Sequence, residues 1–272
     1  MPECNHNCES CGVEGCSSRE IKKLVSNKNT KIKKIIAITS GKGGVGKSLV
    51  TSLTAVALAK KGYKVAIMDA DVTGPSIPKA FGLTDIMAAQ DEEAIYPEVT
   101  KLGIKIMSVN LLLEDNESPI IWRGPLVAGF VQQLFTEVNY GEIDYLLIDM
   151  PPGTGDIPLT VFQSLPIDGI LVVSSPQELV SMVVAKSVNM AKMMFIPILG
   201  LVMNMSYVKC PKCDEKIRLF GDGNYTKEIE KFGVNLLSEL PLDPKLSHLI
   251  DEGKIEDYDV SLLDDVVRKL EN

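Results

Sequence analysis

The chain has 272 residues, 45% of them hydrophobic and 24% charged, and its 28 Lys and Arg against 36 Asp and Glu give a formal net charge of −8. This composition excludes a largely disordered chain and supplies a hydrophobic core without disulfides. The acidic balance argues against nucleic acid or an anionic membrane as the main partner. A secretory signal is absent from the first residues, and the most apolar stretch, residues 193–205, is too short to span a bilayer, so we expect a cytoplasmic protein.

The six cysteines form two groups. Four lie in the first sixteen residues and two lie much later: Cys4, Cys8, Cys11, Cys16, Cys210 and Cys213. In a reducing compartment, clustered cysteines are more often metal ligands or reactive thiols than disulfides. Residues 1–31 are polar and lack apolar periodicity, so we predict a cysteine-rich arm and linker there and one domain at residues 32–272.

From residue 32 onwards, short apolar runs alternate with amphipathic segments. The apolar runs predict strands at residues 35–38, 65–68, 104–109, 145–148, 170–173, 198–203 and near 236–240. Helical spacing predicts helices at residues 47–61, 126–138, 179–194 and 226–232. Continuous Val, Ile and Leu strands separated by helices indicate an α/β fold, a doubly wound and mostly parallel sheet with helices on both faces.

A glycine-rich loop joins the first predicted strand to the first predicted helix. It matches the pattern G-x-x-x-x-G-K-S in the strand, loop and helix context that this pattern requires. Glycines let backbone N–H groups turn toward phosphates, Lys47 reaches the β- and γ-phosphates, and Ser48 offers a hydroxyl to Mg²⁺. A glycine-rich turn without chemistry is the disfavoured alternative. The predicted nucleotide-binding residues are Gly41, Lys42, Gly43, Gly44, Val45, Gly46, Lys47 and Ser48.

Aspartates end two other predicted strands. Asp69 and Asp71 follow one of them, and Asp149 follows another. The carboxyl ends of parallel strands meet at the edge of the sheet where α/β proteins bind ligands. We therefore predict that Asp149 binds Mg²⁺ and that Asp71 activates the attacking water. Asp69 and Asp156 are expected to support this site or to cap turns.

The later cysteine pair forms a C-x-x-C motif, Cys210-Pro211-Lys212-Cys213. Two residues between the thiols permit a tight turn that directs both at one metal. Two thiolates are half of a four-ligand site, and a two-fold dimer would complete it. A bridging 4Fe-4S cluster and a structural zinc both fit such a site, and a redox-active thiol pair is a further alternative.

Lys42, directly after the first glycine, distinguishes this loop from an ordinary P-loop. Here the chain resembles the deviant P-loop ATPases, which include the MinD and ParA proteins, the nitrogenase iron protein and the Mrp/ApbC/Nbp-type iron-sulfur carriers. In that class this lysine reaches the nucleotide of a dimer partner, so the resemblance implies an ATP-dependent homodimer. The alternative is a solvated loop lysine.

Five segments together resemble the Mrp/ApbC/Nbp iron-sulfur cluster carriers over about residues 33–270. They are residues 40–48, 68–76, 122–125, 149–156, and Asn204-Met205 with the Cys-Pro-Lys-Cys that follows. The resemblance implies an ATPase with Lys42, Lys47 and Asp71 as catalytic residues. It also implies a labile 4Fe-4S cluster on Cys210 and Cys213 of a homodimer, received from an upstream donor and passed to apo-proteins.

The same resemblance bears on two further features. It places an adenine contact at Asn204, for which a turn cap is the alternative. Arms with four cysteines hold a second 4Fe-4S cluster in Nbp-type relatives, although the gap between Cys4 and Cys8 is much shorter here than in the eukaryotic pattern. A zinc knuckle is the rival at the arm, and His6 could replace one of its cysteines.

Two other functions remain open. One is a MinD/ParA-like switch, in which ATP-dependent dimerisation serves spatial positioning. The shared loop favours this switch, whereas the net charge disfavours its membrane or DNA partner. The other is a zinc-stapled ATPase that targets client proteins. We expect no nucleic-acid and no membrane partner.

Overall fold

The computed structural model describes residues 23–71, 76–84, 86–112, 124–153, 155–176, 180–220 and 229–272. The arm cysteines Cys4, Cys8, Cys11 and Cys16 lie outside these ranges, as does part of the helix predicted at residues 226–232. The metal site predicted in the arm therefore stays a prediction.

Eight strands form one sheet in the order β10-β7-β6-β1-β5-β2-β4-β3. All neighbouring pairs are parallel except β3 with β4 at one edge. The strands are β1 (Lys31–Thr39), β2 (Val65–Asp69), β3 (Glu98–Val99), β4 (Lys105–Ser108), β5 (Glu142–Asp149), β6 (Gly169–Ser174), β7 (Ile198–Met203) and β10 (Leu236–Glu239). A separate antiparallel pair joins β8 (Val208–Lys209) to β9 (Lys216–Ile217). Every residue of β2 and β6 is buried, as continuous apolar strands in the middle of a sheet should be.

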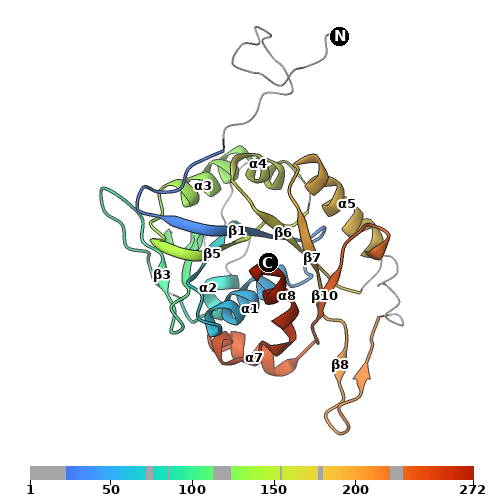
Figure 1. Ribbon diagram of the computed structural model, residues 1–272. Coiled ribbons are helices and arrows are strands. Elements are labelled where there is room, and N and C mark those ends of the chain that lie inside the picture. The colour runs from blue at the N-terminus through green and yellow to red at the C-terminus, as the bar shows by residue number, and fades with distance from the viewer. Residues whose placement is uncertain are drawn as a thin grey trace, which may run out of the picture.

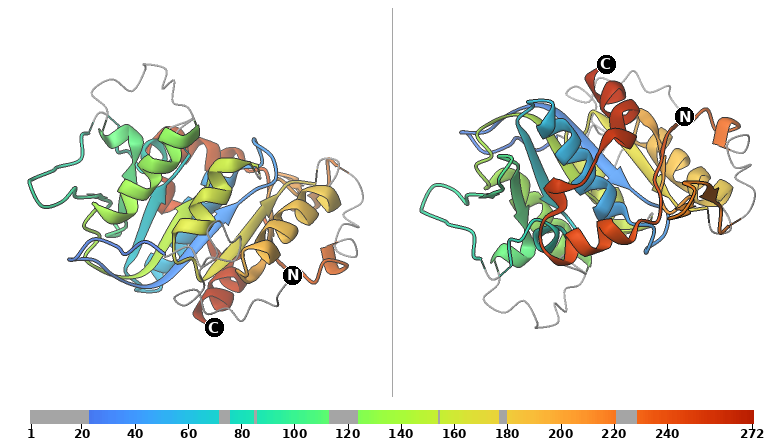
Figure 2. Two further views of the ribbon diagram at one scale, coloured as in Figure 1. Left: turned by 90° about the horizontal axis from the view of Figure 1, so that it is seen from above. Right: turned by 90° about the horizontal axis from the view of Figure 1, so that it is seen from below.

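Helices cover both faces of the sheet. They are α1 (Lys47–Lys60), α2 (Ser76–Ala80), α3 (Gly124–Thr136), α4 (Asp156–Ser164), α5 (Val180–Met193), α7 (Pro244–Asp251) and α8 (Asp264–Glu271). Short 3-10 turns lie at Val109–Leu112, Ile255–Asp257 and Ser261–Leu263. Helices α3, α4 and α5 pack on one face, and α1, α2, α7 and α8 pack on the other (Figures 1 and 2). The predicted α/β fold is confirmed, and no helix in the described ranges is long and apolar enough to cross a membrane.

Four helices were not predicted from the sequence: α2, α4, α7 and α8. Helix α4 carries Pro158 in its first turn, where proline is tolerated but weakens the sequence signal for a helix. Helix α7 begins at Pro244, and the Asp243 side chain accepts a hydrogen bond of 2.9 Å from the Lys245 amide. An aspartate cap followed by proline at the first helical position is a start signal that could have revealed α7.

Candidate functional site

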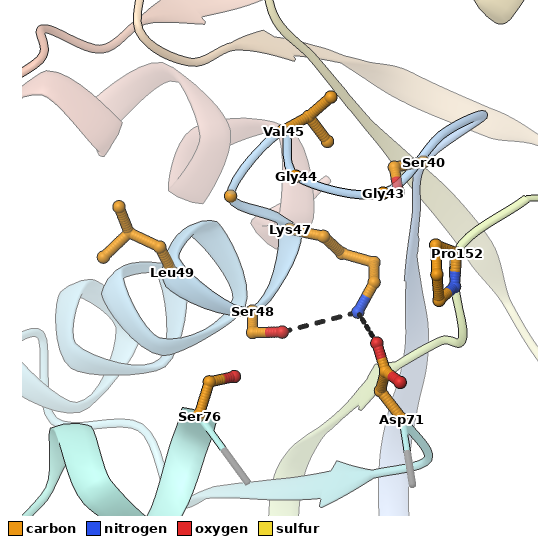
Figure 3. Close-up of a pocket in the computed structure, with 11 residues that line it drawn as sticks. Ser40, Gly43, Gly44, Val45, Lys47, Ser48, Leu49, Asp71, Ser76 and Pro152 are labelled. Atoms are coloured by element: carbon orange, nitrogen blue, oxygen red, sulfur yellow. Dashed lines mark hydrogen bonds and ion pairs between the residues drawn. The ribbon is translucent and has the colours of Figure 1, made fainter. Parts of the chain in front are cut away.

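The loop after β1 borders a cavity of about 400 Å³ (Figure 3). Gly44 and Gly46 have φ of 77° and 80°, a left-handed conformation that favours glycine. A Cβ placed on Gly43 or Gly44 meets nothing within 4 Å, so these glycines face open space. Asp71, two residues after the end of β2, and Ser76, at the start of α2, line the cavity. A loop with exposed backbone around such a space suits a phosphate chain.

Lys47 lies at the centre of a buried charge cluster. Its Nζ is 2.8 Å from Asp149 Oδ2 and 3.6 Å from Asp71 Oδ2. The side chains of Lys47, Asp149 and Asp71 are 5%, 0% and 15% exposed, so solvent screens these attractions only weakly. The structure thus brings together three residues that were predicted from separate motifs, and Figure 3 shows the contact between Lys47 and Asp71.

Both oxygens of the Asp149 carboxylate accept hydrogen bonds from hydroxyl groups of α1. The Ser48 hydroxyl donates to Asp149 Oδ2 at 2.5 Å, and the Thr51 hydroxyl donates to Oδ1 at 2.8 Å. Hydroxyl and carboxylate oxygens are the ligands that Mg²⁺ prefers, so Ser48 and Asp149 fit this ion. Thr51 was not predicted. Its place three residues after Ser48 on one helix face is the signal that could have found it.

Asp69 lies beside Asp149, because the register of β2 and β5 pairs the two residues. It is buried, and it accepts hydrogen bonds of 3.1 Å from the Asp71 amide and 3.0 Å from the Ser108 hydroxyl. Burial, and then the charge of Asp149, raise the pKa of Asp69 well above its ordinary value. Asp69 therefore holds the turn that carries Asp71.

We expect the substitution Asp69→Asn to stabilise the protein at neutral pH in the absence of nucleotide and metal. A group whose folded pKa is raised contributes stability at low pH and loses that contribution as the pH rises through the folded pKa. The free energy of unfolding of the variant should therefore increase relative to that of the wild type as the pH rises from about 4 to about 8. Denaturant unfolding across this range measures the difference.

Asp91 is a suitable control, because its pKa is shifted in the opposite direction to that of Asp69. Hydrogen bonds from the Glu93 amide, the Tyr96 hydroxyl and the Ala94 amide lower the pKa of its exposed carboxyl. Its stabilising contribution is therefore present above its unfolded pKa and is lost as the pH falls. We expect Asp91→Asn to be destabilising at neutral pH, with a difference that shrinks in acid. If the unfolding free energies of the two variants changed in the same way with pH relative to the wild type, burial would not be the cause of the raised pKa of Asp69.

Asn204 directly follows β7 and contacts the backbone of the glycine-rich loop. Its buried side-chain amide donates to the Val45 carbonyl at 2.9 Å. A Cβ on Gly46 would collide with the same nitrogen, so glycine is required there by this close approach as well as by its φ. Asn204 thus braces the loop, while its predicted contact with adenine stays a prediction.

Removing this brace should weaken nucleotide binding. We expect Asn204→Ala to lower the affinity for ADP by about tenfold, because an unpaired buried carbonyl costs about 1–3 kcal/mol and the loop loses its fixed shape. Titration calorimetry measures the affinity. Ser206→Ala is the matched control, because it removes a neighbouring hydrogen bond of 2.9 Å to Met203 without touching the loop. If both variants lost the same ADP affinity, Asn204 would not have this specific role in holding the loop.

Lys42 begins the loop beside Gly41, and both residues are half-buried. The Ser40 hydroxyl donates to the Lys42 carbonyl at 3.0 Å, which fixes the backbone at this position. Among the residues described, no carboxylate forms an ion pair with its ammonium group. Its action on a partner's nucleotide stays a prediction.

Cys210 and Cys213 lie in the turn between β8 and β9, on a hairpin that projects from the body of the protein (Figure 1). The Cys210 amide donates to the Glu215 carbonyl at 2.9 Å, and the Asp214 amide donates to the Cys210 carbonyl at 3.0 Å. Cys213 is exposed and Cys210 is half-buried. The structure therefore presents the predicted thiol pair at the surface.

Backbone amides surround the Cys210 sulfur. Donation from the amides of Lys212 and Cys213, and then from the Cys213 side chain, lowers the pKa of Cys210. This favours the thiolate, which is the form that binds metals. Within the described ranges, no group of three or more His, Cys, Asp or Glu side chains could hold a metal. That the pair forms half of a four-ligand site stays a prediction.

Comparisons with known proteins agree on one family. Residues 31–270 match the model of the NUBPL iron-transfer P-loop NTPases, of the ParA group. The chain is 47% identical over 259 residues to an iron-sulfur cluster carrier protein of Clostridium perfringens, covering 92% of this chain and 90% of the relative. It is 45% identical over 261 residues to a protein of the same name from Methanocaldococcus jannaschii, with 93% and 90% covered.

Two solved structures are also similar to this chain. A nucleotide-binding protein from Archaeoglobus fulgidus, solved in complex with ADP, has a TM-score of 0.77 and 45% identity, covering 86% of this chain and 91% of that one. The cell division ATPase MinD of Pyrococcus furiosus has a TM-score of 0.61 at 23% identity, covering 88% and 98%, a likeness of fold alone. The chain therefore belongs to the family of NUBPL iron-transfer P-loop NTPases.

Proposed function

We propose that the chain is an ATP-hydrolysing iron-sulfur cluster carrier, which assembles a labile 4Fe-4S cluster at a homodimer interface and passes it to apo-proteins. One arrangement carries this proposal. The P-loop follows the carboxyl end of β1, and the thiol hairpin leaves the carboxyl end of β7, so both lie at the same edge of the sheet. Asn204 contacts the loop directly and precedes Cys210 by only a few residues.

The described side chains suit ATP hydrolysis. Lys47 would neutralise the β- and γ-phosphates, and Asp71, at the cavity wall and 3.6 Å from Lys47 Nζ, would orient the attacking water and accept its proton. Ser48 and Asp149 would hold the magnesium ion that accompanies ATP. When bound, Mg²⁺ would stabilise the charge that develops on the phosphate oxygens.

The thiol pair is assigned to the cargo. Two copies of Cys210 and Cys213 supply the four thiolates that a 4Fe-4S cluster takes. The ammonium of Lys42 would cross the dimer to the partner's nucleotide and so tie dimerisation to ATP. In the arm, Cys4, Cys8, Cys11 and Cys16 would hold a second 4Fe-4S cluster. An upstream donor would load the hairpin, and apo-proteins would receive the cluster.

Anaerobic reconstitution with iron and sulfide tests the proposal. We expect about four iron atoms on each arm and about four shared by each dimer, with equal acid-labile sulfide and Mg²⁺-dependent ATP hydrolysis. Zinc without labile sulfide would support the zinc-stapled ATPase instead. Retention on liposomes or DNA that depends on ATP, with no bound iron, would support the positioning switch.

A further inference from the structure

Met205, between β7 and β8, has a backbone conformation that its residue type disfavours. Its φ is 57°, in the left-handed region, and the other non-glycine residues with a positive φ in the described ranges are Phe195 at 55° and Asp214 at 58°. Phe195 follows the end of helix α5, where this conformation is common, and aspartate adopts it more readily than most residues do. Met205 lies at no helix end, and its neighbours impose the conformation.

Backbone hydrogen bonds hold the chain on both sides of Met205. The Asn204 amide donates to the Ser174 carbonyl of β6 at 2.8 Å, and the Ser206 amide donates to the Leu240 carbonyl at 2.9 Å. Both Asn204 and Ser206 are buried. A disfavoured conformation persists where the surrounding structure determines it, and such residues gather at functional sites. The sheet therefore fixes Met205 in the left-handed region.

The side chain of Met205 packs against the glycine-rich loop. Its Cε lies 3.7 Å from the position that a Cβ on Gly46 would occupy. Gly46 lines the cavity and directly precedes Lys47. Met205 is half-buried, so its methyl group fills the space beside the loop. A shift of the loop when a nucleotide binds would therefore displace this side chain, because packed interiors transmit such shifts.

On its other side, Met205 is two residues from Tyr207, which directly precedes the thiol hairpin. Tyr207 is buried, and Lys216 Nζ, from the second strand of the hairpin, lies 4.4 Å from the centre of its ring. Arg218 donates two hydrogen bonds, of 3.2 and 3.1 Å, to the carboxylate of Glu239 in β10. The orientation of the hairpin thus depends on the segment that contains Met205.

We propose that Met205 is a positioning residue that passes the state of the glycine-rich loop to the hairpin, so that a bound nucleotide changes the exposure of Cys210 and Cys213. The inference rests on the proposed function and deepens it, since it gives ATP a route to the cluster ligands. That route is short. It runs from Gly46 to Met205 by a side-chain contact, and from Met205 to Tyr207 along a backbone that the sheet holds.

The test measures how fast iodoacetamide alkylates the two thiols of metal-free protein, with and without saturating Mg-ADP. In the wild type we expect the two rates to differ at least about fivefold. In Met205→Gly they should be equal, because glycine adopts the conformation without strain and leaves no side chain against the loop. Met205→Ala should also lose most of the difference. Met205→Leu, with an apolar side chain of similar volume, should restore it.

Phe195→Gly is the matched control. Phe195 has nearly the same φ, is 95% exposed and follows the end of α5, so its variant relieves the same strain away from the loop and should keep the wild-type difference. Titration of each variant with ADP shows that it is folded and sets the saturating concentration.

Three results would overturn the inference. They are a wild type whose thiols react equally with and without Mg-ADP, Met205→Gly and Met205→Ala proteins that keep the wild-type difference, and a Phe195→Gly protein that loses it as Met205→Gly does. In the last case glycine would act through general flexibility. The assay contains no iron, so the proposed function fails separately, if reconstituted wild-type protein binds no iron at the hairpin.

Discussion

Replacing Lys47 with alanine should slow ATP hydrolysis strongly and, in the same protein, lower the stability of the nucleotide-free fold. The ammonium is 5% exposed and lies between Asp149 and Asp71, with Asp69 beside them. Its loss removes the cation that we propose to neutralise the phosphates, which we expect to cost a factor of about 10² to 10³ in the rate. It also leaves a fully buried carboxylate without its ion pair, at about 3–5 kcal/mol of unfolding free energy.

Lys42→Ala is the matched control, because it removes a lysine from the same loop that has no ion pair among the described residues. We expect it to leave the unfolding free energy within about 0.5 kcal/mol of the wild type. The rate of ATP hydrolysis by this variant should fall only if hydrolysis depends on the homodimer. Denaturant unfolding and a phosphate-release assay measure both quantities. A Lys47→Ala protein as stable as Lys42→Ala would contradict the buried charge cluster.

The parts of the fold that the sequence predicted are those with strong local signals. Apolar runs located seven strands, and β2 and β6 among them are buried along their whole length. The strands β3, β8 and β9 were not predicted, because each has only two residues. The loop motif located Lys47 and Ser48, and the strand ends located Asp149. Because parallel strands end at one edge, the topology alone brings these groups together.

What escaped prediction depends on contacts between distant segments. Thr51 is an ordinary helix residue until β5 places Asp149 within 2.8 Å of its hydroxyl. The amide of Asn204 meets the Val45 carbonyl across 159 positions of sequence. Such pairings follow from tertiary packing, which a local pattern does not contain.

The second large effect is expected from the double substitution of Cys210 and Cys213 by serine. A cluster shared by two chains contributes about two iron atoms to each, so reconstituted iron should fall from about six to about four per chain, and transfer to an apo-protein should stop. The substitutions lie outside the nucleotide cavity, so ADP affinity should be unchanged. Iron analysis, labile sulfide and activation of an apo-protein measure the outcome.

Substitutions in the arm provide the opposite test, in which the arm cluster is lost and the hairpin cluster is kept. Serine at Cys8 and Cys11 should remove about four iron atoms per chain and leave the hairpin cluster transferable. The two variants therefore lose different amounts of iron and differ in the function that they lose. If the hairpin variant kept its full iron content and its transfer activity, Cys210 and Cys213 would not be the cluster ligands. The lowered pKa of Cys210, produced by the amides of its own turn, would then serve thiol chemistry in place of metal binding.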